Sequence, residues 1–346
     1  MSSTRLNEVS SLTPLLSILL PVYNVADYLD ECVESIISQI DGDDIEVILL
    51  DDASTDNSHL LCEALCQKHG SVITLLRHSH NQGLSAARNT LLAASRGKYL
   101  WFIDSDDAIL PEAIADLRKV LIAHAPDIVM CDYVQDGRVY ASFEGKAHSL
   151  ECDGEALVRG VFASRKMQIW TKISLRALWA GDLQFSVGKC FEDISLTPWL
   201  YLKAKSYYYC PKPWVFYRTR ADSIMGKISQ TKAVFDDHKN DDLASALSGY
   251  RHDFNQKFPN PSPETLYFMA HFCAKEFTKI TYRLVTSRTG RDAWKRISAK
   301  LNRYHITMQD CSPLSFDDLN REYLRRLKIG RWLITKLCMR LARRAV

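Results

Sequence analysis

A group of acidic residues directly follows an apolar stretch in the first third of the chain. Residues 98–111 read KYLWFIDSDDAILP, and the apolar run stops at Asp104, Asp106 and Asp107. Carboxylates this close together repel one another unless a cation or basic groups neutralise them. The pattern predicts a buried strand whose end binds a divalent metal or accepts several hydrogen bonds. An ordinary acidic surface turn is the alternative from this stretch alone.

A second apolar run also ends in acids. Residues 45–50 read IEVILL and are followed by Asp51 and Asp52. Parallel strands end at a common edge of the sheet, and open α/β folds bind ligands at that edge. We therefore expect Asp52 and Asp104 at one edge, which favours a metal or nucleotide site over a solvated turn.

Apolar runs and helical patterns alternate along the first half of the chain. Expected strands cover 15–20, 45–50, 72–76 and 99–103, and expected helices cover 27–40, the stretch from Thr55 or Asp56 to Gly70, and 84–95. This alternation predicts a doubly wound, mainly parallel sheet. Further expected elements are a helix from Pro111 to His124, a strand at 127–133, a hairpin within 135–149, helical or mixed structure at 167–178, a helix at 194–204, and short strands at 206–210 and 214–218.

The chain is predicted to be helical from about Gln230 to its end. The last helix, roughly 321–344, would carry basic residues on one side and Arg331 as an exception on its apolar side. The apolar side comprises Leu324, Leu327, Ile334, Leu337, Cys338 and Leu341. A basic amphipathic helix is typical of proteins that lie on anionic membranes. Packing on the domain with a solvated basic face is the equal alternative.

Composition sets broad limits on the protein class. The chain has 346 residues, 47% hydrophobic and 25% charged, with a net charge of +3, values that suit one large or two modest globular domains. The N-terminal residues lack a signal-peptide pattern and no apolar run is long enough to span a bilayer, so we expect a cytoplasmic protein. We expect no nucleic-acid partner. The ten Cys contain no CxxC pair, and we interpret them as small buried side chains.

Several motifs occur in an order and spacing that resemble one enzyme family. They are ILLPVYN at 18–24, ILLDDASTDNS at 48–58, NQGLSAARN at 81–89, GKYLWFIDSDD at 97–107, FEDISL at 191–196, and Tyr217-Arg218 followed by Ser223. Over about residues 14–225 the chain resembles the family 2 glycosyltransferases of the GT-A fold. The resemblance implies an α/β GT-A fold with a doubly wound, mainly parallel, Rossmann-like sheet and a helical C-terminal extension. Together with the helical pattern after about Gln230, this predicts a polar N-terminal tail (1–14), a nucleotide-sugar-binding half (15–115), an acceptor-binding half (116–225) and a helical C-terminal region with a basic amphipathic terminal helix (226–346).

The resemblance implies a donor site for a nucleotide sugar. Pro21, Tyr23 and Asp52 would surround the uracil and ribose, with Asp51 structural. Asp104-Ser105-Asp106 matches the DxD motif, which holds Mn²⁺ or Mg²⁺ through carboxylate and diphosphate oxygens. Asp106 would be the direct ligand and Asp104 would lie nearer the ribose or a metal-bound water. Asp107 is a weaker candidate.

The resemblance also implies a catalytic base on the acceptor side. Family 2 enzymes invert the anomeric carbon, and a single displacement needs one base opposite the leaving group. Asp193 matches that base, with Glu192 as its neighbour. Capping of the helix is the plain reading of both acids, and we expect the helix N-terminus to keep Asp193 ionised.

Other residues have implied or open roles. Arg88 would organise the nucleotide side, and Lys172 would meet the diphosphate or acceptor. Trp170 is either a sugar platform or core, while Arg218 and Ser223 would belong to a loop over the diphosphate. We interpret His78 and His80 as surface histidines. Because Ala53 stands where the family has Gly, we predict that its turn needs no positive φ.

These inferences predict an inverting, metal-dependent glycosyltransferase. The donor would be a UDP-hexose or UDP-N-acetylhexosamine. The acceptor would be a bacterial surface glycan such as O-antigen, capsule or lipopolysaccharide core, lipid-linked and reached at the inner face of the cytoplasmic membrane. The alternatives are an inactive sugar-nucleotide-binding or assembly scaffold, which would be expected to lack one of the acids, and a nucleotidyltransferase, which would normally carry a glycine-rich phosphate loop.

Overall fold

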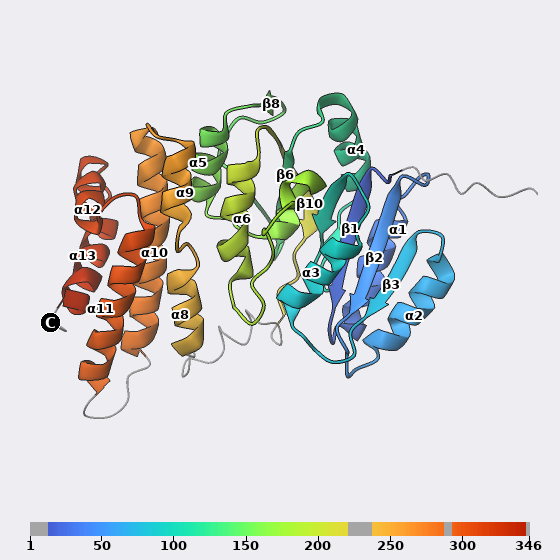
Figure 1. The fold of residues 1–346 in the computed structure, drawn as a ribbon, viewed down its shortest axis with the longest axis horizontal. Helices are drawn as coiled ribbons and strands as arrows, with labels where there is room; N and C mark the ends of the chain where they lie inside the picture. Colours follow the sequence, from blue (N-terminus) through green and yellow to red (C-terminus); the bar gives the residue numbers. More distant parts are fainter. Residues whose placement is uncertain (1–12, 221–236, 287–292, 344–346) are drawn as a thin grey trace, which may run out of the picture.

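The computed structural model describes residues 13–220, 237–286 and 293–343. Its sheet has ten strands, and the main path runs β3-β2-β1-β4-β9-β6-β10-β5, with β7 beside β6 and β8 beside β10. Helices cover both faces of the sheet, and a set of helices extends from one end of the molecule (Figure 1). The predicted fold class is confirmed.

The first half follows the predicted alternation of strands and helices. Its elements are β1 (Leu16–Val22), α1 (Ala26–Ile37), β2 (Ile45–Asp51), α2 (Ser58–His69), β3 (Ile73–Arg77), α3 (Leu84–Ala94) and β4 (Tyr99–Phe102). All four strands are parallel, since β2 pairs with both β1 and β3 and β1 pairs with β4. Strands buried on both faces explain the continuous apolar runs of the sequence.

The second half adds antiparallel strands. Its elements are β5 (Ala108–Ile109), α4 (Ala113–His124), β6 (Ile128–Gln135), β7 (Arg138–Tyr140), β8 (Leu150–Glu151), α5 (Gly154–Ser164), β9 (Lys172–Leu175), α6 (Glu192–Lys203) and β10 (Tyr207–Phe216). β9 lies antiparallel between β4 and β6, within a stretch predicted to be helical or mixed. The two predicted short strands after α6 form the single strand β10, whose register with β6 shifts on either side of Pro213.

Two apolar clusters lie on opposite faces of the sheet. One includes Val33 and Leu117 and is covered by α1, α2 and α4. The other includes Leu91, Leu157 and Leu200, and it continues from α3, α5 and α6 into the C-terminal helices. One continuous core therefore joins the sheet to the helical region.

The C-terminal helices are α8 (Asp237–Ser245), α9 (Tyr250–Lys257), α10 (Pro263–Thr286), α11 (Ala293–Cys311), α12 (Phe316–Arg325) and α13 (Ile329–Arg343). The prediction of one helix over 321–344 is wrong, because the helix breaks at 326–328. Leu327 takes φ 54°, and the Lys328 N–H donates to the Tyr323 carbonyl at 2.7 Å. A left-handed residue that closes a helix in this way is ordinarily glycine, so apolar periodicity gave no sign of the break.

The predicted domain boundary cannot be compared with the described residues, whereas the cysteines can. The boundary at 225/226, with Ser223, lies outside the described residues. Among the described helices, none combines the length and apolarity that crossing a bilayer requires. All ten Cys are free thiols, and seven of them are buried, whereas Cys152 is exposed.

Candidate active site

The carboxyl ends of β1, β2 and β4 meet at one edge of the sheet. Val22 of β1 is in register with Asp51 of β2, and Leu19 of β1 is in register with Phe102 of β4. Tyr23, Asp52 and Asp104 therefore follow three adjacent strand ends, as the sequence predicted. Tyr23 is 45% exposed at this edge.

Arg88 of α3 joins the two acidic motifs. Its Nη2 lies 2.8 Å from Asp104 Oδ1, while its Nη1 lies 2.8 Å from Glu192 Oε1 and 3.3 Å from Asp193 Oδ1. The Arg88 side chain is 1% exposed, whereas the three carboxylates are 17–27% exposed. One buried guanidinium thus holds the DxD carboxylate and the acids at the N-terminus of α6 in a single cluster that still reaches solvent.

Burial and charge set the ionisation of this cluster. Burial raises the pKa of Asp193 to about 7; Arg88 opposes this rise, and Glu192 and Asp104 add to it. The three acids in turn hold the pKa of Arg88 above its usual value despite burial. The expected effect of the helix N-terminus on Asp193 is therefore outweighed by desolvation.

The DxD segment is bound on several sides. Ser105 is buried and its Oγ donates to the Pro21 carbonyl at 2.7 Å, which fixes the segment to the end of β1. Asp106 Oδ2 lies 2.7 Å from Arg220 Nη2. Asp107 is buried, its Oδ1 accepts from the Arg218 N–H at 2.8 Å, and burial beside the other two acids raises its pKa to about 9.

These side chains fit a hard divalent cation only together with a diphosphate. Within the described residues, no group of three or more His, Cys, Asp or Glu side chains is arranged to hold a metal. Asp104 and Asp106 supply two partly exposed carboxylates, and Asp107 Oδ2 is buried without a hydrogen-bond partner. Mg²⁺ characteristically takes one or two protein carboxylates and completes its shell with phosphate oxygens and water.

Asp52 is more deeply buried than the predicted contact with a uracil base would require. Its Oδ1 accepts from Gln82 N at 2.9 Å, its Oδ2 accepts from Gly83 N at 2.8 Å, and His78 Nδ1 lies 2.6 Å from Oδ1. The interpretation of His78 as a surface histidine is wrong, since its side chain is 8% exposed and also contacts Thr90. Asp52 and His78 together hold the loop that leads into α3.

The turn after β2 differs from its prediction. Ala53 takes φ 55°, so the turn uses the left-handed region although no glycine is present. The neighbouring Asp51 Oδ1 accepts from the Ser54 N–H at 3.0 Å and holds this turn closed. Ala in place of the family's Gly restricts the backbone freedom of this position, but the left-handed conformation is kept.

Lys172 and Trp170 are interior residues. The Lys172 side chain is fully buried and its Nζ donates to the Lys166 carbonyl at 2.6 Å. Burial lowers the pKa of Lys172 to about 7, and the nearby Asp193 opposes this change. Trp170 stacks on Tyr217 at 5.3 Å between ring centroids and is 3% exposed, which fits the core reading.

Three residues of the site were not predicted from the sequence to belong to it. Arg220 pairs with Asp106, and His78 contacts Asp52. The Asn89 side chain bonds both the N–H and the carbonyl of Phe185, each at 2.9 Å, and so fastens the loop before α6 to α3. Asn89 is the last residue of the NQGLSAARN motif, and its place in that motif could have identified it. Arg220 and His78 lie outside the quoted motifs.

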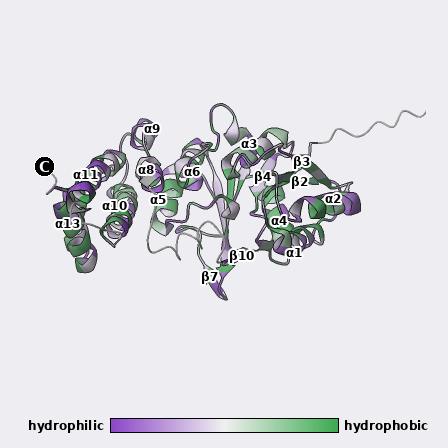
Figure 2. Ribbon diagram, turned by 90° about the horizontal axis from the view of Figure 1, so that it is seen from below, coloured by the Kyte–Doolittle hydropathy of each residue, from purple (hydrophilic) through white to green (hydrophobic). Residues whose placement is uncertain are grey.

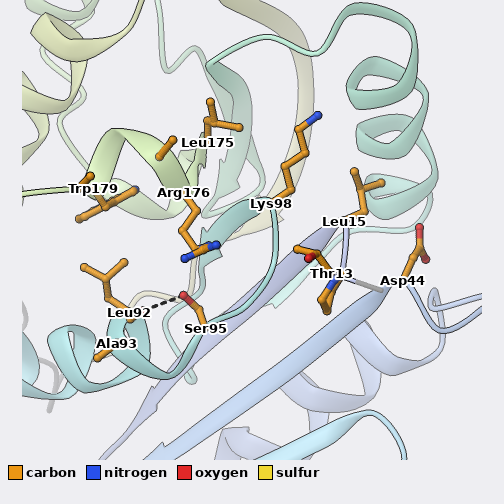
Figure 3. Close-up of a pocket in the computed structure, with 13 residues that line it drawn as sticks. Thr13, Leu15, Asp44, Leu92, Ala93, Ser95, Lys98, Leu175, Arg176 and Trp179 are labelled. Carbon is orange, nitrogen blue, oxygen red and sulfur yellow. Dashed lines mark hydrogen bonds between the residues drawn. The ribbon is translucent and has the colours of Figure 1, made fainter. Parts of the chain in front are cut away.

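Two cavities lie away from the acidic edge. One of about 780 Å³ is bordered by Thr13, Lys98 and Arg176 (Figure 3), and because Lys98 precedes β4 it lies at the opposite edge of the sheet. The other, of about 270 Å³, lies between α6 and α8 and includes Ser195 and Trp199, which follow Asp193 on α6.

Comparison with known proteins identifies the family. A family model described as glycosyl transferase family 2 matches residues 17–173. Glycosyltransferase GlyG of Streptococcus pneumoniae serotype 4 (strain ATCC BAA-334 / TIGR4) is 30% identical over 230 residues, which cover 62% of this chain and 74% of GlyG. Glycosyltransferase GlyA of the same strain is 30% identical over 219 residues, which cover 60% of this chain but only 31% of GlyA.

The fold comparison extends over almost the whole chain. The structure of S. aureus TarS 1–349 in complex with UDP-GlcNAc superposes with a TM-score of 0.68 at 19% identity, covering 94% of this chain and 91% of TarS 1–349. At this identity the likeness concerns the fold, including the helical C-terminal region. With its motifs, its acidic edge and the match to GlyG, the chain belongs to glycosyl transferase family 2.

Proposed function

We propose that the chain transfers a hexose or N-acetylhexosamine from a UDP-sugar to a bacterial surface-glycan acceptor, with inversion at the anomeric carbon. The acceptor class is an O-antigen, a capsule or a lipopolysaccharide core carried on a lipid. The observation that carries the proposal is the Arg88 bridge, which brings Asp104 of the DxD motif and Asp193 of α6 to one guanidinium. The UDP-GlcNAc complex of TarS supports the choice of a UDP-sugar.

The donor binds along the edge formed by β1, β2 and β4. Tyr23 is exposed there and stacks on the uracil, while Asp52 contacts the base or holds the loop that does. Asp104 and Asp106 hold Mn²⁺ or Mg²⁺ together with the diphosphate. When bound, the cation offsets the negative charge of the departing UDP. The buried Arg88 guanidinium holds Asp104 in position from the interior side.

The acceptor reacts from the side of α6. Asp193 takes the proton of the acceptor hydroxyl while the hydroxyl oxygen bonds to the anomeric carbon and the bond to UDP breaks. Glu192 shares the Arg88 guanidinium and helps to fix Asp193.

The test is the replacement of the proposed base. Asp193→Asn should lower the rate of UDP release by at least about a hundredfold, the scale of general-base catalysis. The wild-type rate should rise with pH up to about 7, because Asp193 acts only when deprotonated and its pKa is raised to about 7. UDP release is measured with a panel of UDP-sugars and acceptor glycans, with and without Mn²⁺.

The controls separate the possible outcomes. Glu63→Gln on α2, which is 46% exposed, should leave the rate unchanged. An Asp193→Asn enzyme with wild-type turnover would remove Asp193 from the role of base. Binding of UDP-sugars without turnover on any acceptor would favour the scaffold alternative.

A further inference from the structure

The last two helices carry exposed apolar side chains on their outer surface. Six large hydrophobic side chains of 324–337 are 42–82% exposed: Leu324, Leu327, Ile329, Leu333, Ile334 and Leu337. We call them the α12–α13 face. α12 and α13 lie at the end of the molecule remote from β3 and α2 (Figures 1 and 2).

α13 is apolar on two sides. Its inner side packs on the other C-terminal helices through Thr335, Cys338, Met339 and Ala342, which are 0–7% exposed. Leu333 and Leu337 lie on the opposite side of the helix and are 58% and 56% exposed. Packing on the domain is confirmed for the inner side of α13 and does not use these leucines.

The charge around this face is strongly positive. Residues 316–346, which include α12 and α13, hold nine Lys and Arg against three acids, so their net charge is +6 and residues 1–315 have a net charge of −3. Lys328 and Arg340 are exposed, and Arg325 is exposed but pairs with Glu322. The charge of the chain is thus divided between a basic end and an acidic remainder.

We propose that the α12–α13 face binds the surface of an anionic lipid bilayer. Apolar side chains would enter the boundary between headgroups and acyl chains while the flanking bases contact anionic headgroups. The 15 residues of α13 are too few to span the hydrocarbon layer, so the helix would lie in the plane of the surface.

Charge complementarity selects this occupant over two others. A second copy of the chain would bring two strongly basic ends together, and like charges oppose such a contact. A nucleic acid would use the bases but would leave the six apolar side chains in water, because phosphate contacts dominate such binding. An anionic bilayer would contact both the basic residues and the exposed apolar side chains.

The test is cosedimentation of the whole chain with vesicles. Wild-type protein should bind vesicles that contain phosphatidylglycerol, bind phosphatidylcholine vesicles less, and dissociate as salt is raised. The double variant Leu333→Ser/Leu337→Ser should bind about tenfold more weakly, since each Leu loses the gain from burying its side chain. Far-UV circular dichroism and thermal unfolding check that the variant is folded.

A matched control uses equally exposed apolar residues elsewhere. Leu60 on α2 and Ile122 on α4 are 54% and 72% exposed, and Leu60→Ser/Ile122→Ser should bind vesicles like the wild type. Equal binding by the Leu333/Leu337 variant, or no binding by the wild type, would overturn the proposal. A wild-type dimer that becomes monomeric in the variant would instead assign this face to self-association. UDP release with a soluble acceptor is measured separately and tests the catalytic proposal independently.

Discussion

At the scale of single residues, Arg88 determines the geometry of the site. Three carboxylates from two distant segments share its guanidinium, and desolvation is tolerable only because the positive and negative charges offset each other. Lysine would keep the charge but not the planar fork that reaches both Asp104 and Glu192.

Replacing Arg88 should therefore affect both rate and stability. Arg88→Lys should lower the free energy of unfolding by about 2 kcal/mol and slow UDP release at least tenfold, since it loses charge-assisted hydrogen bonds. Chemical denaturation and UDP release measure the two effects. Arg118→Lys on α4, whose side chain is 29% exposed and pairs with Asp44, is the control and should change neither by much. Wild-type activity in Arg88→Lys would mean that the bridge is dispensable.

Ala53 gives a second prediction at this scale. Its φ of 55° is costly for a residue with a Cβ, by roughly 1 kcal/mol, and glycine avoids that cost. Ala53→Gly should leave the free energy of unfolding unchanged or raise it by up to about 1 kcal/mol, as measured by urea denaturation. Ala64→Gly, at an exposed position within α2, should lower it by about 1 kcal/mol. Equal losses in both variants would show that the turn carries no strain.

At the scale of elements, Glu46 ties three strands together at the edge opposite the site. Its Oε1 accepts from Ser17 Oγ at 2.6 Å, from Arg96 N at 2.6 Å and from Gly97 N at 3.1 Å. A Cβ on Gly97 would lie 2.5 Å from Ser17 N, so only glycine allows the chain to enter β4 this closely. The carboxylate thereby links β1, β2 and the start of β4.

The contribution of Glu46 should depend on pH. Burial opposes its charge, but the hydrogen bonds outweigh burial and lower the pKa of Glu46. Its stabilisation is therefore complete above the ordinary value of 4.5 and is lost as pH falls through the lowered folded-state pKa. Glu46→Gln should be about 1–2 kcal/mol less stable at neutral pH, with the gap shrinking in acid. Denaturation at several pH values measures the gap, and a constant gap would refute the linkage.

Element order was predictable from the sequence, but several local features were not. Alternating apolar runs predicted β1 to β4 and the common edge of Asp52 and Asp104, because strands buried on both faces have a distinctive composition. β9 was not predicted because it has only four residues, too few to show the alternation of a strand. It lies between the short 3-10 helices Ile169–Thr171 and Arg176–Trp179. The role of His78 was missed because its partner, Asp52, is distant in sequence, and the break at Leu327 was missed because a left-handed leucine gives no sequence signal.

At the scale of the whole molecule, the apolar core passes from the sheet into the helical region without interruption. Phe162 of α5 contacts Phe272 of α10 at 5.4 Å between ring centroids, and the indole N–H of Trp199 donates to Asp253 of α9 at 2.8 Å. The proposed division at 225/226 therefore does not coincide with a break in the apolar core.

The whole chain should unfold as one unit. Calorimetry and tryptophan fluorescence should give a single coincident transition, since separating the helices would expose the apolar sides of α5 and α6. A shortened chain that ends at residue 236 should be insoluble or lack a cooperative transition. Two separated transitions, with a folded shortened chain, would instead establish two independent domains.

The Arg88 bridge also restricts how such enzymes can be recombined. Arg88 and Glu192 are 104 positions apart and belong to the proposed donor-side and acceptor-side halves. A chimera that exchanges one half with a relative would inherit the buried guanidinium and Asp104 from one parent and Glu192 and Asp193 from the other. Donor and acceptor preferences of this enzyme can therefore be exchanged by domain shuffling only between parents that place the same charges at this contact.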